Sequence, residues 1–366
     1  MRVSFFAHTA LGNAIGRTYS LWLLTEELGW DARIHVPDAD RVWAPLQDEK
    51  RFRSCFRTSI DEAGSSDVLV AVKPLPGSFG LALRVRARTG HPLVLDVDDP
   101  DWEWAFGFHR RHAFVRAARR ILRGRPAFPV DGGGTNRRPH LAAYRESRLR
   151  GRARHLGAVA ISNPTLSRWY PGTLVPHVRV PVPVPSASQG AGLRVAFVGT
   201  PRQHKGIEVL RSAARSVDGV RLLVTAAAPP DASSNEEWIG ETSLAAGLRL
   251  VGDADVVALP SLDTGYARYQ FPVKVIDAML AERAIVASDL APLRWAAEGA
   301  ALFVPPGDVE SLARALDRLR DPTFRESLGR RGRSMALARF TPQAVAPAFA
   351  GLIEEAGRQR RHWWHR

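Results

Sequence analysis

Residues 196–213 read AFVGTPRQHKGIEVLRSA, and this stretch decides the predicted fold. An apolar strand runs to Gly199, a polar turn holds Arg202 and Lys205, and an amphipathic helix begins after Gly206. A glycine directly after a strand lets the backbone approach a ligand, and cations beside a helix N-terminus suit a diphosphate. The alternative is ordinary, because strand–glycine–turn–helix is a common pattern and surface cations are often only solvated.

A second polar stretch, ARYQFPVKVIDAM (267–279), also precedes a predicted helix. Pro272 suits the first turn of that helix, whose free N–H groups and dipole attract an anion. Lys274 and Asp277 are three positions apart and therefore lie on one helix face. They form either an exposed ion pair worth a few tenths of a kcal/mol or a grip on a ligand, with Lys274 supplying charge and Asp277 accepting from a ribose hydroxyl. Taken alone, this stretch does not decide between the two.

Short apolar runs alternate with helical patterns along the whole chain, which predicts parallel, doubly wound α/β sheets. Residues 179–192, RVPVPVPSASQGAG, interrupt the alternation as a Pro- and Ser-rich linker, so the 366 residues divide into two domains. Strands are predicted at 2–7, 67–72, 92–97, 193–198, 220–226, 256–259, 284–287 and 301–304, with helices at 17–28, 79–88, 207–216 and 309–319.

Together, the two polar stretches resemble the donor domain of GT-B glycosyltransferases, specifically family 4 of the retaining enzymes (glycosyl transferases group 1). The motifs that carry the resemblance are FVGTPRQHKG (197–206), ALPS (258–261) and IDAM (276–279), and it covers residues 193 to about 345. It implies a GT-B fold, with two Rossmann-like, doubly wound parallel-sheet domains facing each other across a cleft. It also implies metal-independent transfer of a sugar, with retention, from a UDP, GDP or dTDP donor to an acceptor hydroxyl, without a cofactor.

The resemblance assigns roles to individual residues. Arg202 and Lys205 would hold the donor diphosphate and act in catalysis by stabilising charge on the leaving group. Asp277 takes the place of the family's ribose-binding Glu, and Pro272 and Lys274 match a subset of the family with a Pro and a Lys just before that acid. The implied donor site further comprises Gly199, Thr200, Tyr269, Gln270, Phe271, Pro272 and Lys274.

The sequence departs from the family pattern at two points. Tyr269 stands where the family commonly has a Glu that touches the donor sugar, so we expect sugar contacts from elsewhere in 263–271, with Gln270 as the candidate. Thr200 replaces the usual Arg after the glycine, and Arg202 is placed to compensate.

The first predicted strand leads into HTALGNAIGR (8–17). This stretch lacks the G-x-G-x-x-G fingerprint, which disfavours a dinucleotide-binding oxidoreductase. In the family that the chain resembles, the corresponding glycine turn lies under the reacting sugar, which makes Gly12 and Asn13 acceptor-side candidates. His177, just before the linker, is a further candidate for this side, although a lone histidine is more often structural.

An acidic stretch, VLDVDDPDWEW (94–104), follows another predicted strand. Its Asp-x-Asp pattern binds a divalent metal in a different glycosyltransferase fold, but GT-B enzymes generally work without one. Asp98 and Asp99 stand where the family often has a His-Asp pair, so we interpret them as catalytic, acceptor-side groups that orient or deprotonate a hydroxyl. An equally weighted alternative is that these acids cap the next helix and offset nearby arginines.

The net charge of +14 is concentrated in one segment. Between residues 105 and 154 there are fourteen arginines and only two acidic residues, Asp131 and Glu146. The pattern of residues 109–125 predicts a basic amphipathic helix. This helix and the Arg- and Trp-rich tail 358–366 suit an anionic partner or peripheral contact with a membrane surface. A packed helix with a solvated Arg face and a frayed tail are the commoner meanings.

These observations define the predicted organisation. Residues 1–185 form an acceptor-binding domain, 186–340 form a nucleotide-sugar donor domain, and 341–366 form a C-terminal helix that packs back toward the N-terminal domain. The expected acceptor is a glycolipid, a polysaccharide precursor or a small molecule. Two alternative functions stay open: a nucleic-acid-binding protein, prompted by the sequence pI of about 11.0, and a GT-B relative with epimerase- or phosphorylase-like activity. The single Cys55 and the lack of an apolar run near the roughly 20 residues that span a bilayer predict a cytoplasmic protein, with peripheral contact at the inner face of the membrane left open.

Overall fold

The computed structural model describes residues 1–101, 156, 158–184 and 192–363. The chain forms two compact units, and neither is a continuous segment. Unit 1 comprises Met1–Arg41, Ser54–Pro176 and Ala346–Arg366, and unit 2 comprises Val42–Arg53 and His177–Val345. The chain therefore changes unit about nine residues before the predicted boundary at 185, and also in the predicted C-terminal helix.

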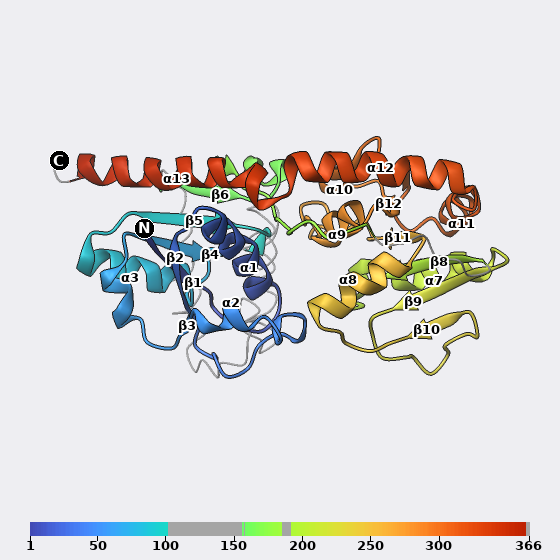
Figure 1. The fold of residues 1–366 in the computed structure, drawn as a ribbon, viewed down its shortest axis with the longest axis horizontal. Coiled ribbons are helices and arrows are strands. Elements are labelled where there is room, and N and C mark those ends of the chain that lie inside the picture. Colours follow the sequence, from blue (N-terminus) through green and yellow to red (C-terminus); the bar gives the residue numbers. More distant parts are fainter. Residues whose placement is uncertain (102–155, 157, 185–191, 364–366) are drawn as a thin grey trace, which may run out of the picture. The chain divides into compact units, whose positions relative to one another are not determined.

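Unit 1 contains a seven-stranded sheet in the order β3-β2-β1-β4-β5-β6-β7, and every pair of neighbours is parallel. Buried β-branched and leucine side chains fill β4 and β5 on both faces, as expected for central strands covered by helices. Its strands are β1 (Arg2–Phe6), β2 (Asp31–His35), β3 (Phe56–Arg57), β4 (Val68–Val72), β5 (Leu93–Val97), β6 (Val159–Ile161) and β7 (Thr173–Leu174), and its longer helices in the first half of the chain are α1 (Asn13–Glu27) and α3 (Phe79–Thr89) (Figure 1).

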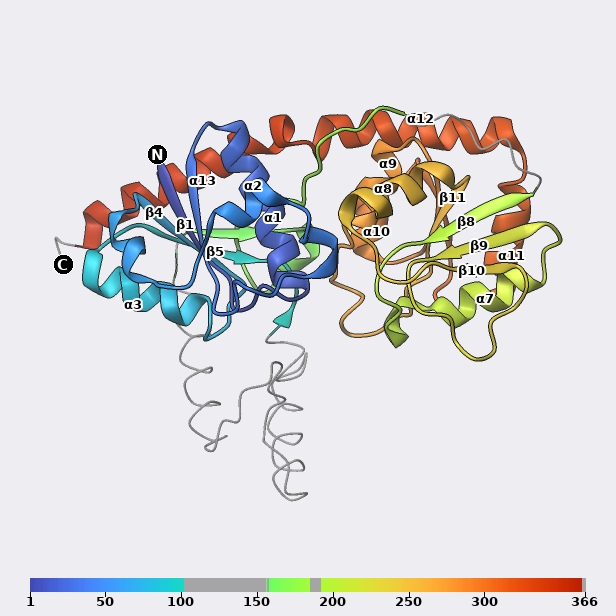
Figure 2. The ribbon, with the colours of Figure 1, turned by 60° about the horizontal axis from the view of Figure 1, so that its bottom comes forward.

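Unit 2 contains a second all-parallel sheet, six-stranded in the order β10-β9-β8-β11-β12-β13. Its strands are β8 (Leu193–Phe197), β9 (Val220–Val224), β10 (Glu236–Trp238), β11 (Val256–Leu259), β12 (Ala284–Ser288) and β13 (Ala301–Val304). Its helices are α7 (Ile207–Arg215), α8 (Leu244–Asp253), α9 (Lys274–Leu280), α10 (Ala291–Ala297), α11 (Val309–Arg318) and α12 (Pro322–Arg339) (Figure 2). Helix α13 (Pro342–Trp363) begins in unit 2 and continues in unit 1.

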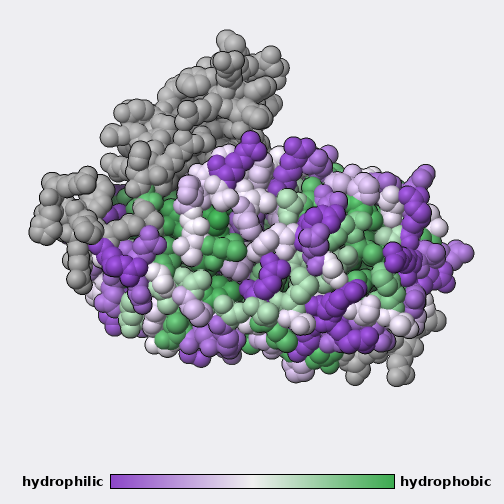
Figure 3. All heavy atoms as spheres, turned by 90° about the horizontal axis from the view of Figure 1, so that it is seen from above, coloured by the Kyte–Doolittle hydropathy of each residue, from purple (hydrophilic) through white to green (hydrophobic). Residues whose placement is uncertain are grey.

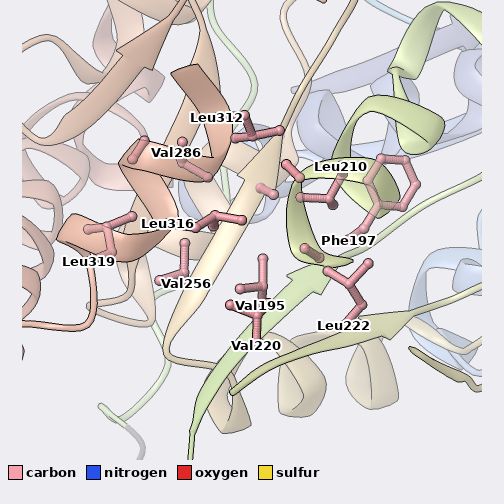
Figure 4. Packing of buried hydrophobic residues seen from close by; sticks show 14 of the residues in the cluster. Val195, Phe197, Leu210, Val220, Leu222, Val256, Val286, Leu312, Leu316 and Leu319 are labelled. Atoms are coloured by element: carbon pink, nitrogen blue, oxygen red, sulfur yellow. The ribbon is translucent and has the colours of Figure 1, made fainter. Parts of the chain in front are cut away.

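The sheet of unit 2 has a hydrophobic core on each face. Because side chains alternate along a strand, Val256 of β11 and Val286 of β12 face one core while Val257 and Ile285 face the other. Figure 4 shows the first core, in which leucines of α7 and α11 point toward valines of β8, β9, β11 and β12. Helices α9 and α10 supply the second core, so both faces are covered and the sheet is doubly wound.

Helix α12 lies close to the second core because its inner face carries small residues. Gly329 and Gly332 are three positions apart and buried, and a Cβ on Gly329 would lie 2.2 Å from the Glu282 carbonyl oxygen. Only glycine permits that approach to the end of α9.

In each sheet the chain changes winding direction at one point, between β1 and β4 in unit 1 and between β8 and β11 in unit 2. Ligands of open α/β sheets bind beyond the carboxyl ends of the strands at this switch point. The loops after β1 and β4, and those after β8 and β11, are therefore where the fold places a site in each unit.

Several predictions concern residues that the structure does not describe: the basic helix at 109–125, the central linker residues 185–191 and the last part of the tail 358–366. Within the described ranges, no helix is long and apolar enough to cross a membrane. In the view of Figure 3, hydrophilic side chains are spread among smaller hydrophobic areas over the described surface.

Candidate functional site

The turn after β8 depends on Gly199, whose φ of 125° is strained for any other residue. The Gly199 N–H donates to Thr225 Oγ1 at 2.7 Å, which ties the turn to the end of β9. A Cβ on Gly199 would find only Lys274 Cε, at 3.9 Å, within 4 Å. The glycine turn of the first motif therefore lies directly beside the lysine of the second.

Gly206 brings the loop after β8 against the loop after β11. It adopts a left-handed conformation with φ 69°, and a Cβ there would lie 1.9 Å from the Pro260 carbonyl oxygen. The Leu262 N–H also donates to the His204 carbonyl at 2.9 Å. Glycine is thus required at position 206 both for the left-handed backbone conformation and for the close approach to Pro260.

Lys205 and Gln270, which belong to different motifs, meet at this junction. Lys205 Nζ donates to Gln270 Oε1 at 2.7 Å, so the amide holds the ammonium group between the two loops. Both side chains are half-buried, which leaves them reachable by a ligand.

Asp277 accepts from two cations. It is 2% exposed; its Oδ1 accepts from Arg179 Nε at 2.9 Å, and its Oδ2 lies 3.5 Å from Lys274 Nζ. Burial lowers the pKa of Lys274, Asp277 opposes the shift, and Arg179 adds to it. The ion pair between Lys274 and Asp277 therefore exists. It is buried rather than exposed on the surface, and Arg179 is its third member.

A hollow in unit 2 opens beside these residues. Gly199, Thr200 and Lys274 line it together with the hydroxyl side chains of Thr225, Thr242 and Ser243. Trp43, Pro45 and Leu244 provide apolar lining. The hollow thus offers a lysine, the carboxylate of Glu241, several hydroxyls, the backbone of a glycine and an aromatic surface.

The other predicted donor residues lie in varied surroundings. Arg202 is exposed, and Tyr269 and Pro272 are half-buried. Phe271 is 3% exposed and packs on Trp295 and Phe340, with ring centroids at 5.2 and 5.7 Å, so its side chain belongs to the core.

His177 belongs to unit 2, whereas the other acceptor-side candidates belong to unit 1. It is buried, and its ring lies 6.0 Å from that of Phe271. These contacts place it in the core around Phe271.

In unit 1, residues at the ends of β1, β4 and β5 meet around a buried lysine. Lys73 is 3% exposed, and its Nζ lies 2.7 Å from Asp99 Oδ2 and 3.2 Å from Asp101 Oδ2. Asn13 Nδ2 donates to the same Asp99 oxygen at 3.4 Å, and Gly12 precedes α1 with φ 87°. Lys73 itself has φ 69°, a costly conformation for a residue with a Cβ, which marks this turn as specialised.

A second buried ion pair lies under this cluster. Arg17 of α1 and Asp96 of β5 are both fully buried, and Arg17 Nη2 donates to Asp96 Oδ1 at 2.7 Å. Arg17 Nη2 also donates to the Val175 carbonyl at 2.6 Å, so the pair links α1, β5 and the segment after β7. Asp98 is 4% exposed and contributes to the field that raises the pKa of Arg17.

Asp101 and His8, in the same region, also have displaced pKa values. Burial raises the pKa of the Asp101 carboxyl to about 7, against the opposing effect of Lys73 and with added repulsion from Asp99 and Asp98. Burial, followed by the charge of Lys73, lowers the pKa of His8 to about 4, so His8 is neutral at physiological pH.

Residues 192–321 match the family model for glycosyl transferases group 1. The match is to a group 1 glycosyltransferase domain and lies within unit 2. The matched residues include the turn after β8, helix α9 and all residues that line the hollow except Trp43 and Pro45. No curated protein matches the chain.

Solved structures show the fold of the whole chain. Sucrose-phosphate synthase from Thermosynechococcus elongatus is similar with a TM-score of 0.65 and 15% identity, over 97% of this chain and 98% of that one. Anabaena HepE in complex with UDP is similar with a TM-score of 0.72 and 12% identity, over 97% and 100%. The glycosyltransferase from Rickettsia africae gives 0.61 and 10%, over 97% and 98%. The chain has the GT-B fold, as its sequence predicts, with one Rossmann-like parallel sheet in each unit.

Three residues near the candidate sites were not predicted from the sequence: Arg179, Lys73 and Trp43. Arg179 lies in the Pro-rich linker, where no periodicity marks it. Lys73 follows a predicted strand and is one of only four lysines, which is a signal that could have singled it out. Trp43 reaches the group 1 domain from a distant part of the chain, which only the tertiary structure reveals.

Proposed function

We propose that the protein is a retaining glycosyltransferase that moves a sugar from a nucleoside diphosphate sugar to an acceptor hydroxyl, without a metal ion or another cofactor. One observation carries the proposal: two separate motifs meet at the switch point of the unit 2 sheet, where Gly199 lies beside Lys274 and Lys205 donates to Gln270. Anabaena HepE, which shares the fold, has been solved with UDP and with UDP-glucose.

On the donor side, the diphosphate binds at the turn after β8. Lys205, Lys274 and the exposed Arg202 supply positive charge, and the backbone at Gly199 has no side chain to obstruct a phosphate. Cations placed before the reaction stabilise the negative charge that grows on the leaving diphosphate as the bond to the sugar breaks. Catalysis on this side is electrostatic and needs no nucleophile.

Asp277 binds the donor ribose in this proposal. A carboxylate has about four acceptor positions, and Arg179 and Lys274 approach one oxygen each. Positions therefore remain for a ribose hydroxyl, while the two cations orient the carboxylate. Gln270, held by Lys205, is the candidate for a sugar hydroxyl in place of the acid that Tyr269 replaces.

On the acceptor side, the cluster at the switch point of unit 1 receives the hydroxyl. Asp98 and Asp99 follow β5, and Lys73 and Asn13 hold Asp99 in place. A fixed carboxylate can accept the acceptor hydroxyl's hydrogen bond and take its proton as the new glycosidic bond forms. The acceptor's class, the cytoplasmic location and the membrane contact proposed for 109–125 and 358–366 stay predictions from sequence.

The donor assignment is tested by thermal shift and calorimetry with UDP, GDP and dTDP. We expect the wild-type protein to bind at least one of the three. Lys205→Ala and Lys274→Ala should each weaken its binding about tenfold or more, because each removes a charge-assisted hydrogen bond worth about 1.5–3 kcal/mol.

Arg314→Ala is the control, since Arg314 is an exposed cation of the same unit outside the proposed site. Equal affinity in Lys205→Ala, Lys274→Ala and Arg314→Ala would refute the residue roles, and no response of the wild type to millimolar UDP, GDP or dTDP would refute the function. The configuration of the product's anomeric carbon, read by NMR from a successful transfer, decides retention.

A further inference from the structure

One segment of unit 2 comes from a distant part of the sequence. Residues Val42–Arg53, hereafter the strap, pack with unit 2, whereas the chain on either side of them belongs to unit 1. The strap contains the short helix Ala44–Leu46 and most of the helix Lys50–Ser54. It lies outside the 192–321 segment that matches the family model.

The strap is a folded segment with an internal anchor. The Leu46 N–H donates to the Trp43 carbonyl at 2.8 Å, and Pro45 fixes the backbone at the start of the short helix. Leu46 is 2% exposed and Phe52 is fully buried, so an apolar side chain in each of its two helices anchors the strap. These buried side chains fix the position of Trp43.

Trp43 and Pro45 line the same hollow as Gly199 and Lys274. The Trp43 indole is half-buried and stacks on no other aromatic ring among the described residues. A tryptophan that is partly shielded yet keeps surface at a hollow offers a flat apolar platform to a ligand.

Small and polar residues make up the rest of the lining. Gly247 of α8 is one of them, and a Cβ there would come within 3.4 Å of Thr242 Oγ1 and 3.7 Å of Val198 Cγ1. Next to Thr242, the carboxylate of Glu241 and the hydroxyl of Ser243 add hydrogen-bonding groups. An aromatic side chain beside hydroxyl and carboxylate groups fits the face and the polar edge of a heteroaromatic ring, while the lysine of the same hollow fits a phosphate.

We propose that Trp43 stacks on the nucleobase of the donor, so that the strap is part of the nucleotide site. This inference rests on the proposed function, because it names the group of the donor that a residue outside the family segment recognises. Stacking of a base on an aromatic side chain corresponds to about 5- to 150-fold in affinity. Trp43 therefore contributes affinity for the nucleoside part and nothing for the diphosphate.

The test compares nucleoside diphosphates with inorganic diphosphate. Isothermal titration of UDP, GDP and dTDP against Trp43→Ala should show affinity reduced about fivefold or more for every nucleotide that the wild type binds. Inorganic diphosphate should bind the wild type and Trp43→Ala equally, since Lys205 and Lys274 are untouched, and its binding also reports that the variant is folded. Trp43→Phe keeps a flat ring and should restore most of the nucleotide affinity.

The outcomes separate the inference from the proposed function. If the wild type binds a nucleotide and Trp43→Ala binds it equally well, the inference fails while the function stands. If Trp43→Ala loses nucleotide and inorganic diphosphate together, or Trp43→Phe restores nothing, Trp43 is structural and the inference also fails. If the wild type binds no nucleoside diphosphate, both fall.

Discussion

At the scale of single residues, Asp101 is the group whose charge state the fold controls most visibly. Burial raises the pKa of its carboxyl to about 7, with Lys73 opposing and Asp99 and Asp98 reinforcing the shift. A carboxyl whose pKa is higher in the folded state binds more protons when folded than when unfolded. Its contribution to stability is therefore present at low pH and is lost as the pH rises from about 4 to about 7.

Asp101→Asn should remove this loss, because the amide is neutral at every pH. We expect the free energy of unfolding of the wild type, relative to Asp101→Asn, to fall by about 1–2 kcal/mol between pH 5.5 and pH 8. Urea unfolding at both pH values measures the difference. Asp61→Asn, at an exposed aspartate of unit 1, is the control and should show no such trend; parallel behaviour of the two variants would contradict the assignment.

Residues of the candidate site could be predicted from the sequence only where the signal is local. Gly199 and Lys205 follow the end of a strand and Lys274 opens a helix, so the local pattern of the chain marks all three as candidates. Arg179 and Trp43 reach their partners through long-range contacts, and no spacing in the sequence encodes such contacts. Phe271 was assigned to the donor by its neighbours in sequence, yet its side chain turns into the core, because adjacent residues of a loop point in different directions.

At the scale of elements, the turn Gln203–Lys205 and its glycine decide how two loops join. Gly206→Ala places a Cβ 1.9 Å from the Pro260 carbonyl and forces the loop after β11 to move. Because that loop carries Gln270 and leads to Lys274, we expect nucleotide affinity to fall about tenfold or more, equivalent to about 1.4 kcal/mol, along with stability. Titration with the nucleotide that the wild type binds measures the effect.

Gly299→Ala is the matched control for this substitution. Gly299 also has a positive φ, at 83°, but a Cβ there meets no atom within 4 Å. It shares the backbone strain of about 1 kcal/mol without the clash. Similar nucleotide affinities in Gly206→Ala and Gly299→Ala would show that contact between the loops does not shape the site.

The strands that the sequence revealed are apolar runs of four or five residues. The stretches 256–259 and 301–304 were predicted with the observed bounds of β11 and β13, since apolar runs flanked by turns mark strands. The strands β2, β3, β6, β7 and β10 were missed: β2 carries charged side chains at alternate positions, and the other four have only two or three residues, three of them at sheet edges. The helix expected to include Pro272 in its first turn begins instead at Lys274, after a longer loop.

At the scale of the whole molecule, the sites predict where a nucleotide protects the backbone from hydrogen exchange. A ligand that binds only the folded state suppresses opening of the segments it touches. With a saturating nucleoside diphosphate, we expect slower exchange in 199–206, 240–247 and 260–274, and also in the strap. Peptides containing Lys73 and Asp99 should be unchanged, because they belong to the other unit.

Hydrogen exchange monitored by mass spectrometry gives this map directly, and inorganic diphosphate is the control ligand. It should protect 199–206 but leave the strap unchanged. Protection of the strap by both ligands, or by neither, would contradict the arrangement of base and diphosphate proposed above.

The interleaved course of the chain bears on how such enzymes can be recombined. A cassette cut at the borders of the family match would carry the turn that we propose to bind the diphosphate but leave Trp43 behind in the recipient's first half. A chimera built from such a cassette would inherit its donor preference from two parents at once. Swapping donor specificity between relatives of this chain therefore requires transplanting two separate stretches, and the shorter one, twelve residues long, is invisible to any alignment of the donor half alone.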